Sequence, residues 1–344
     1  MQIRGEPRPQ RATPAAHSAW SSGDIVLLTA ITLLALCLRI TWAVTRDVVI
    51  ENEGAQYTRI AINLAAGNGY VGLKGGPQLL FPPLYPMLIR TGLFFVHSPV
   101  ASARIVSIAA GTLLVPLIFL IVSAAYERRT AWIAAVISCL HPFLIGFSSS
   151  SYADCLYTTL LAGVVYFAIS SLRLARLRSF IALGSLLGLA YLTKPEIIGQ
   201  IALLLVLIVA VGASKHRLKY ALSGSMLVLA CSGVFASPYV AYLSRHAHHF
   251  MLEGKSEVNY EFISRLNPGM DQFQAAYGLS DTGQQEGPLL FRLSGYGVEA
   301  DRRHLDAFNE PELAVTLLDD VRSIVEVLAR FGYDAARVVT RLAA

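Results

Sequence analysis

The chain has 344 residues, of which 54% are hydrophobic and 15% are charged, and its mean hydropathy is +0.53. Soluble globular domains carry about 25% charged residues, so this composition excludes an ordinary soluble protein and indicates a polytopic membrane protein. The net charge of +5 and the pI near 9.0 come largely from short basic turns. Such turns fit contact with anionic lipid, and we expect no nucleic-acid partner.

About seven apolar segments approach the ~20 residues that a helix needs to cross a bilayer. They cover residues 25–44, 102–124, 130–147, 155–172, 179–193, 196–213 and 220–243, and the fifth is short. The first apolar segment is too long for a signal-peptide core, so we expect it to remain as a span. The predicted fold class is therefore an all-α polytopic membrane protein.

The charges separate when the chain is threaded through the membrane with alternating direction. One side receives the basic residues Arg4, Arg8, Arg11, Arg128, Arg129, Arg173, Arg176, Arg178, Lys215, Arg217 and Lys219. By the positive-inside rule this side is the cytoplasm. The other side receives Glu51, Glu53, Asp154, Lys194 and Glu196. We therefore expect an active site that faces away from the cytoplasm.

Residues 46–101 form a first outer loop that is too long for a turn. Apolar residues recur at helical spacing in 53–66, which predicts an amphipathic helix on the outer surface. The segment 82–96 is apolar but short and contains Pro86 and Arg90, and counting it as a span would invert the charge pattern downstream. We expect it to lie at the interface.

This organisation predicts three parts of the chain. Residues 1–23 form a cytoplasmic tail, residues 24–244 form the membrane module, and residues 245–344 form a small extracytoplasmic region that ends in an amphipathic helix. The four cysteines lie within or at the ends of spans without paired or metal-type spacing, so we expect free thiols.

Carboxylates at the outer end of the first span are candidate catalytic bases. Glu51 and Glu53 flank Asn52 where water, lipid headgroups and a substrate can meet, and partial desolvation there raises a carboxylate's proton affinity. Solvated loop carboxylates are the alternative reading. Tyr57, four residues after Glu53, and Tyr85 belong to the same outer loop.

Charged residues at the ends of later spans complete the candidate site. Asp154 begins the fourth span, where it caps the helix or serves a substrate. Lys194, next to Glu196 in a very short hairpin, either reaches a phosphate or snorkels to the interface. Arg39 lies near the outer end of the first span and could pair with Glu53 or with a lipid phosphate. His246, His248 and His249 form no recognisable ligand set, so a divalent metal stays undecided.

Several motifs resemble the GT-C superfamily of membrane glycosyltransferases, in particular family 39, which includes protein O-mannosyltransferases and the lipid A aminoarabinose transferase. The motifs run through residues 52–54, 64–70, 82–86, 103–104, 128–129 and 188–196, and they include Asp154. The resemblance implies a polyprenyl-phosphate sugar donor, an inverting transfer to a lipid, glycan or protein acceptor, and a bacterial cytoplasmic membrane location. It also implies that the acidic motif is the general base, that Asp154 assists, and that Lys194 holds the donor phosphate.

Two features depart from the family pattern. Asn52 stands where the family usually has Asp, which leaves Glu53 or Glu51 to supply the carboxylate. Members also commonly add further spans after the catalytic module. A catalytically silent or truncated homologue is therefore one alternative. A transporter is another, although the spans show no inverted repeat.

Overall fold

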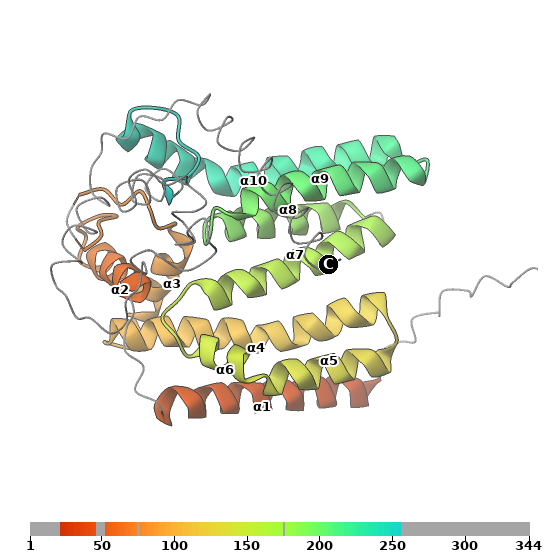
Figure 1. The fold of residues 1–344 in the computed structure, drawn as a ribbon, viewed down its shortest axis with the longest axis horizontal. Coiled ribbons are helices and arrows are strands. Elements are labelled where there is room, and N and C mark those ends of the chain that lie inside the picture. Colours follow the sequence, from red (N-terminus) through yellow and green to blue (C-terminus); the bar gives the residue numbers. More distant parts are fainter. Residues whose placement is uncertain (1–20, 46–51, 74–75, 175, 256–344) are drawn as a thin grey trace, which may run out of the picture.

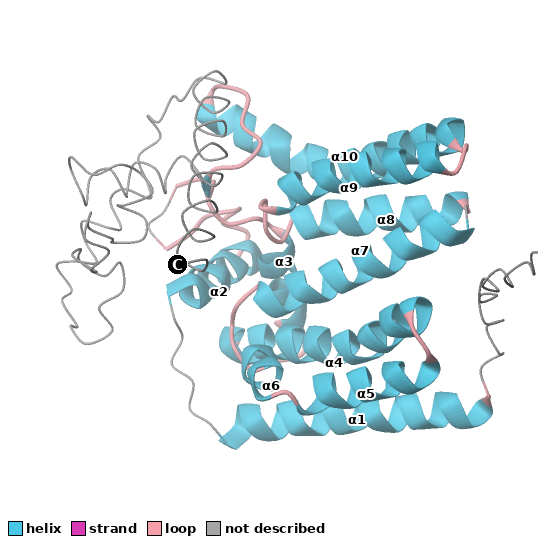
Figure 2. Cartoon of the chain, turned by 45° about the vertical axis from the view of Figure 1, so that its right-hand side comes forward, coloured by secondary structure: helices cyan, strands magenta, loops and turns pink. Residues whose placement is uncertain are grey.

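The computed structural model describes residues 21–45, 52–73, 76–174 and 176–255. Its helices pack as a bundle with two shorter helices at one end (Figure 1), and no strand occurs in these ranges (Figure 2). They are α1 (Ser22–Thr45), α2 (Asn52–Ala65), α3 (Leu84–Gly92), α4 (Pro99–Ala125), α5 (Arg128–Leu140), α6 (Pro142–Ser148), α7 (Asp154–Leu174), α8 (Leu177–Tyr191), α9 (Ile197–Ser214) and α10 (Leu218–Ala247).

The long helices coincide with the predicted spans. Helices α1, α4, α7, α9 and α10 are each long and apolar enough to cross a membrane. Helix α8, with 15 residues, is apolar but shorter. The predicted all-α membrane architecture is confirmed for the described residues.

The third predicted span is broken. Helices α5 and α6 meet at an angle of 55°, so the prediction of one continuous helix over 130–147 is wrong. Pro142 has no N–H to continue the helix, and a residue before proline is disfavoured in helical conformation. His141 accordingly adopts an extended conformation with ψ of 117°.

Helices α8 and α10 approach closely through small residues. A Cβ atom added at Gly184 would lie 2.6 Å from the Val228 carbonyl oxygen, and one added at Gly188 would lie 2.6 Å from the Phe235 Cβ. Close approach through glycine is a common way for membrane helices to pack, because it brings backbones into van der Waals contact. This interface fixes α8, and with it the Lys194 hairpin that follows α8.

The two helices of the outer loop have the predicted character. Tyr57, Ile60 and Ala61 are buried on one face of α2, while Arg59 is exposed on the other. Helix α3 has nine residues, about 14 Å at the rise of an α-helix, and so is too short to span. Both helices lie at the same end of the bundle (Figure 1), which agrees with an interfacial position.

The turns at the opposite end of the bundle are the basic ones. Figure 1 shows the α4–α5, α7–α8 and α9–α10 turns together at that end, away from α2 and α3. The predicted separation of charges is thus present in the described residues. The extracytoplasmic domain predicted for 245–344 lies outside the described residues from 256 onward, as do Arg4, Arg8, Arg11 and Glu51.

Candidate active site

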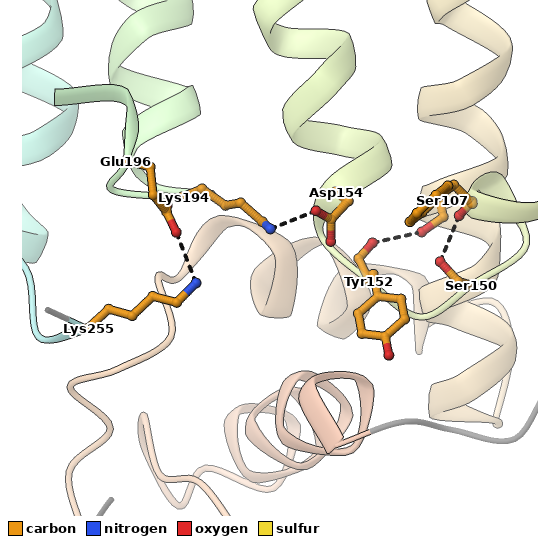
Figure 3. A network of polar contacts seen from close by, with 8 residues as sticks. Ser107, Ser150, Tyr152, Asp154, Lys194, Glu196 and Lys255 are labelled. Atoms are coloured by element: carbon orange, nitrogen blue, oxygen red, sulfur yellow. Dashed lines mark hydrogen bonds and ion pairs between the residues drawn. The ribbon is translucent and has the colours of Figure 1, made fainter. Parts of the chain in front are cut away.

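An ion pair joins the start of α7 to the hairpin between α8 and α9. The Lys194 ammonium donates to an Asp154 carboxylate oxygen at 2.7 Å (Figure 3). The Lys194 side chain is 17% exposed and the Asp154 side chain is 39% exposed. The lysine therefore neither snorkels freely nor lies unpaired, and the aspartate has a partner 40 residues away in the chain.

A second ion pair lies beside the first. The Lys255 ammonium donates to a Glu196 carboxylate oxygen at 2.9 Å (Figure 3). Burial alone would raise the pKa of Glu196, but the hydrogen bond from Lys255 and the positive charge of Lys194 lower that pKa below its ordinary value. Burial likewise opposes the charge of Lys255, but Glu196, Glu53 and Asp154 raise its pKa.

Electrostatic interactions link five charged residues at this end of the bundle, since Glu53 and Asp154 act on Lys255 and Lys194 acts on Glu196. Helix α2 contributes Glu53, which is partly buried and has no hydrogen bond or ion pair within the described residues. The others are Asp154, Lys194, Glu196 and Lys255, and we call the five residues the charged cluster. Within the described residues, Glu53 is therefore the member of the charged cluster that makes no direct ion pair.

Tyr57 lies close enough to three carboxylates of the charged cluster to be affected by their charge. Burial raises its pKa most strongly, and the negative charges of Glu53, Asp154 and Glu196 raise the pKa further. The ring packs edge-on against Phe81 and Tyr85, with centroids 5.1 Å away in each case. Tyr57 is thus a neutral wall of the site, held by the apolar face of the outer loop.

Tyr85, a second predicted loop residue, anchors α3 to α4. Its hydroxyl donates to the Ala103 carbonyl oxygen at 3.1 Å and lies 2.9 Å from the Ser107 Oγ. Burial raises its pKa, so the phenol stays neutral. The side chain is fully buried, and its contacts position α3 and Tyr57.

Tyrosine hydroxyls tie the loop between α2 and α3 to the end of α10. Tyr239 donates to the Leu79 carbonyl oxygen and Tyr242 to the Tyr70 carbonyl oxygen, both at 3.2 Å. The Tyr191 hydroxyl donates to the Leu252 carbonyl oxygen. These bonds hold α10 against the loop and the segment after α10 against α8, and so bring Lys255 to the charged cluster.

Arg39 does not join the charged cluster. Its guanidinium is fully buried between α1 and α6, where Nε donates to the Ser148 Oγ and Nη1 donates to the Ala35 carbonyl oxygen, both at 3.0 Å. A guanidinium enclosed in this way offers no face to a lipid phosphate. The predicted contact with Glu53 or phosphate is therefore replaced by a contact that joins helices.

The structure describes some of the other predicted site residues but not all of them. Asn52 begins α2, one residue before Glu53, and Glu51 lies outside the described residues. No group of three or more His, Cys, Asp or Glu side chains in the described ranges could hold a metal ion. His246 instead contacts the Tyr242 carbonyl oxygen at 2.8 Å.

Sequence reasoning missed Lys255. The residue follows the last span in a region without a recognisable motif, and its partner Glu196 lies 59 residues earlier. No local sequence pattern marks it, because several other basic residues, among them Arg59, Arg90 and Arg245, belong to the same end of the bundle.

Comparisons with known proteins agree with this architecture. The model of the family described as Dolichyl-phosphate-mannose-protein mannosyltransferase matches residues 81–240, which include Asp154 and Lys194. The crystal structure of ArnT from Cupriavidus metallidurans bound to undecaprenyl phosphate is similar, with 18% identity, a TM-score of 0.52, and coverage of 67% of this chain and 43% of that chain.

A second solved structure is the S. cerevisiae protein O-mannosyltransferase Pmt1-Pmt2 complex bound to the sugar donor. It has 16% identity and a TM-score of 0.54, and the alignment covers 74% of this chain and 38% of that chain. A search of curated proteins found no match. The chain thus shares its membrane fold with these two glycosyltransferase structures, and the predicted resemblance to the O-mannosyltransferase family agrees with the match over residues 81–240. The chain spans less than half the length of either protein.

Proposed function

We propose that the protein is a glycosyltransferase that moves a sugar from a polyprenyl-phosphate donor to an extracytoplasmic acceptor, with inversion at the anomeric carbon. The observation that carries the proposal is the charged cluster, at one end of a GT-C fold, in which Lys194 pairs with Asp154 (Figure 3) and Glu53 makes no ion pair within the described residues. The similar structures support the donor class, since one was solved with undecaprenyl phosphate and the other with a sugar donor.

In the proposed reaction the Glu53 carboxylate accepts the proton of an acceptor hydroxyl. The acceptor oxygen attacks the anomeric carbon, and the bond between that carbon and the phosphate oxygen breaks. The electron pair stays on the phosphate, which leaves as polyprenyl phosphate with an additional negative charge. A cation beside that oxygen stabilises the transition state more than the ground state.

Lys194 is the proposed cation. It lies near two carboxylates, so a donor phosphate competes with Asp154 for the same ammonium. When Lys194 turns to the phosphate, Asp154 loses its partner and can hold an acceptor hydroxyl. Lys255 is the second proposed phosphate-binding cation, and Glu196 positions it.

The proposed location is the bacterial cytoplasmic membrane with the charged cluster facing outward. The turns at the opposite end carry the excess of lysine and arginine, which favours the cytoplasmic side for that end. The acceptor class, whether lipid, glycan or protein, stays open within the proposal.

The test is transfer of radiolabelled sugar from a panel of polyprenyl-phosphate sugars by the full chain in proteoliposomes. We expect transfer by the wild type and a loss of at least about 100-fold in Glu53→Gln and Lys194→Ala, because each removes a group that acts in the transition state. No transfer from any donor would contradict the proposal and favour a catalytically silent homologue. Donor uptake without transfer would favour a transporter.

A charge swap separates structure from chemistry at the Asp154–Lys194 pair. The double variant Asp154→Lys with Lys194→Asp restores an ion pair, so we expect near-normal thermal unfolding with no recovery of transfer. The matched control is Asp24→Asn, which breaks the Asp24–Arg128 pair of 2.9 Å at the opposite end of the bundle. That variant should transfer sugar at the wild-type rate.

A further inference from the structure

A recess lies between helix ends far from the charged cluster. The ends of α7 and α9 and the starts of α8 and α10 form it, at the end of the bundle opposite α2 and α3. Polar side chains of Lys215, Arg217 and Tyr220 line one part, and apolar side chains of Phe180, Ile208 and Val211 line another. Such a surface matches a ligand with an anionic head and an apolar tail.

The two turns that border the recess carry charge of one sign. They contain Arg173, Arg176, Arg178, Lys215, Arg217 and Lys219. The acidic residues of these four helices and the turns between them are Asp154 and Glu196, and both lie in the charged cluster at the opposite end of the bundle. On the same end of the bundle, by contrast, Arg128 is paired with Asp24. The helices that form the recess therefore supply cations but no carboxylate, and the recess suits an anionic ligand.

The α9–α10 turn holds Lys215 and Arg217 in a tight conformation. The Arg217 N–H donates to the Gly212 carbonyl oxygen at 2.8 Å, and His216 has a positive φ of 54°. A Cβ atom on Gly212 would lie 2.2 Å from the Ala221 Cβ, so α9 and α10 are in contact directly behind the turn. Lys215 and Arg217 are therefore presented together at the recess.

Tyr220 supplies a hydrogen-bond donor without a partner. Its hydroxyl is enclosed by protein and makes no hydrogen bond in the described structure, although its ring packs edge-on against Phe180 at 5.5 Å. Enclosed polar groups are normally paired, so this hydroxyl is available to an oxygen atom of a ligand in the recess. A phosphate or ester oxygen would accept this bond.

We propose that this recess binds the headgroup of an anionic phospholipid. Lys215 and Arg217 hold the phosphate, Tyr220 donates to a phosphate or ester oxygen, and the acyl chain follows the apolar surface of α9. Basic pockets between membrane helices bind anionic headgroups in this way. The site is separate from the charged cluster, and its occupancy does not depend on the proposed transferase activity.

The test is native mass spectrometry of the full chain, purified in detergent and titrated with cardiolipin, phosphatidylglycerol or phosphatidylcholine. We expect bound cardiolipin and phosphatidylglycerol on the wild type and little phosphatidylcholine. Affinity for the anionic lipids should fall about fivefold in Lys215→Gln and again in Lys215→Gln with Arg217→Gln, since each basic residue near a lipid surface contributes about that factor. Tyr220→Phe should lower it by a smaller factor.

Lys219→Gln is the matched control, because it removes the same charge from the same turn without lining the recess. An equal loss in Lys219→Gln and Lys215→Gln would overturn the proposal, since diffuse surface charge would then explain the binding. Equal binding of phosphatidylcholine would also overturn it, as would full displacement of lipid by millimolar inorganic phosphate. Size-exclusion profiles and thermal unfolding confirm that each variant is folded.

Discussion

The two ends of the helix bundle use lysine and arginine in different ways. At the charged cluster, Lys194 and Lys255 are each paired with a carboxylate and are partly buried. At the opposite end, Lys215 and Arg217 line a recess on helices that carry no acidic residue over 197–252. A lysine that is paired with a carboxylate must exchange that partner for a substrate before it can bind the substrate. A group of cations without carboxylates attracts an anion without such an exchange.

The two ends also differ in the contacts that join their segments. Tyrosine hydroxyls and aromatic contacts tie the outer loop, α10 and the segment after α10 together around the charged cluster. The opposite end is formed by short turns between helices (Figure 1). A catalytic group needs fixed geometry about the reacting atoms, whereas the proposed lipid site needs cations and a hydrogen-bond donor beside an apolar surface.

The largest expected effect distinguishes the two outer-loop carboxylates. Glu53→Gln should lower the transfer rate by about 100- to 10,000-fold, the range for loss of a general base. Glu51→Gln is the matched control and should keep most of the activity, measured with the same labelled donor. The reverse result would assign the base to Glu51.

Lysines at the two ends should differ nearly as much. Lys194→Met should lower kcat by about 100-fold, because it removes a cation from the developing phosphate charge. Lys215→Met, at the opposite end, should change kcat less than about twofold. Similar losses in both variants would show that net charge, and not position, controls the rate.

Close packing between α8 and α10 should contribute to the stability of the whole helix bundle. Gly184→Val should lower the free energy of unfolding by about 1–3 kcal/mol, because the new side chain meets the Val228 backbone at once. Gly199→Val in α9 is the control, since a Cβ atom there has nothing within 4 Å. Thermal unfolding in detergent would measure both variants, and equal shifts would argue against the glycine contact.

A smaller effect is expected from the second ion pair. Lys255→Ala should raise KM for the donor by about two- to fivefold, since partly exposed ion pairs contribute little. Lys219→Ala is the control at the opposite end. A large fall in kcat would instead place Lys255 at the reacting phosphate.

The smallest expected effect is the pH dependence of the segment that carries Lys255. The pKa of Glu196 is lowered from 4.5, so its pair stabilises the protein above that pH and weakens as pH falls through the lowered value. The pKa of Lys255 is raised from 10.5, so the pair weakens again only as pH rises through the raised value. A spin label at Leu252→Cys should therefore be immobile between these limits. In Lys255→Gln it should be mobile throughout, and an unchanged signal would contradict the role of the pair.

Much of the fold could be predicted from the sequence. The apolar segments, the amphipathic helix over 53–66 and the interfacial nature of 82–96 all depend on local composition and periodicity. The break at His141 and Pro142 was missed because the surrounding apolar run hides a proline that the local backbone rules would have flagged.

The site could be predicted only in part. The sequence indicated that Asp154, Lys194 and Glu196 lie on one face, but it left their partners open. It placed Arg39 near a phosphate, whereas packing encloses that side chain against Ser148. The position of a residue within an apolar segment predicts its depth in the membrane. The neighbour that its side chain contacts depends on how the helices pack.

By itself the sequence determined that this is a membrane protein of apolar helices with basic turns at one end and acidic loops at the other. Hydropathy and charge act residue by residue through transfer between water and lipid, so they can be read along the chain. Only the tertiary structure decided that Lys194 meets Asp154 and that Lys255 returns to Glu196, over separations of 40 and 59 residues. Those contacts depend on close helix packing at glycine and on tyrosine bonds between distant segments, which no local pattern specifies.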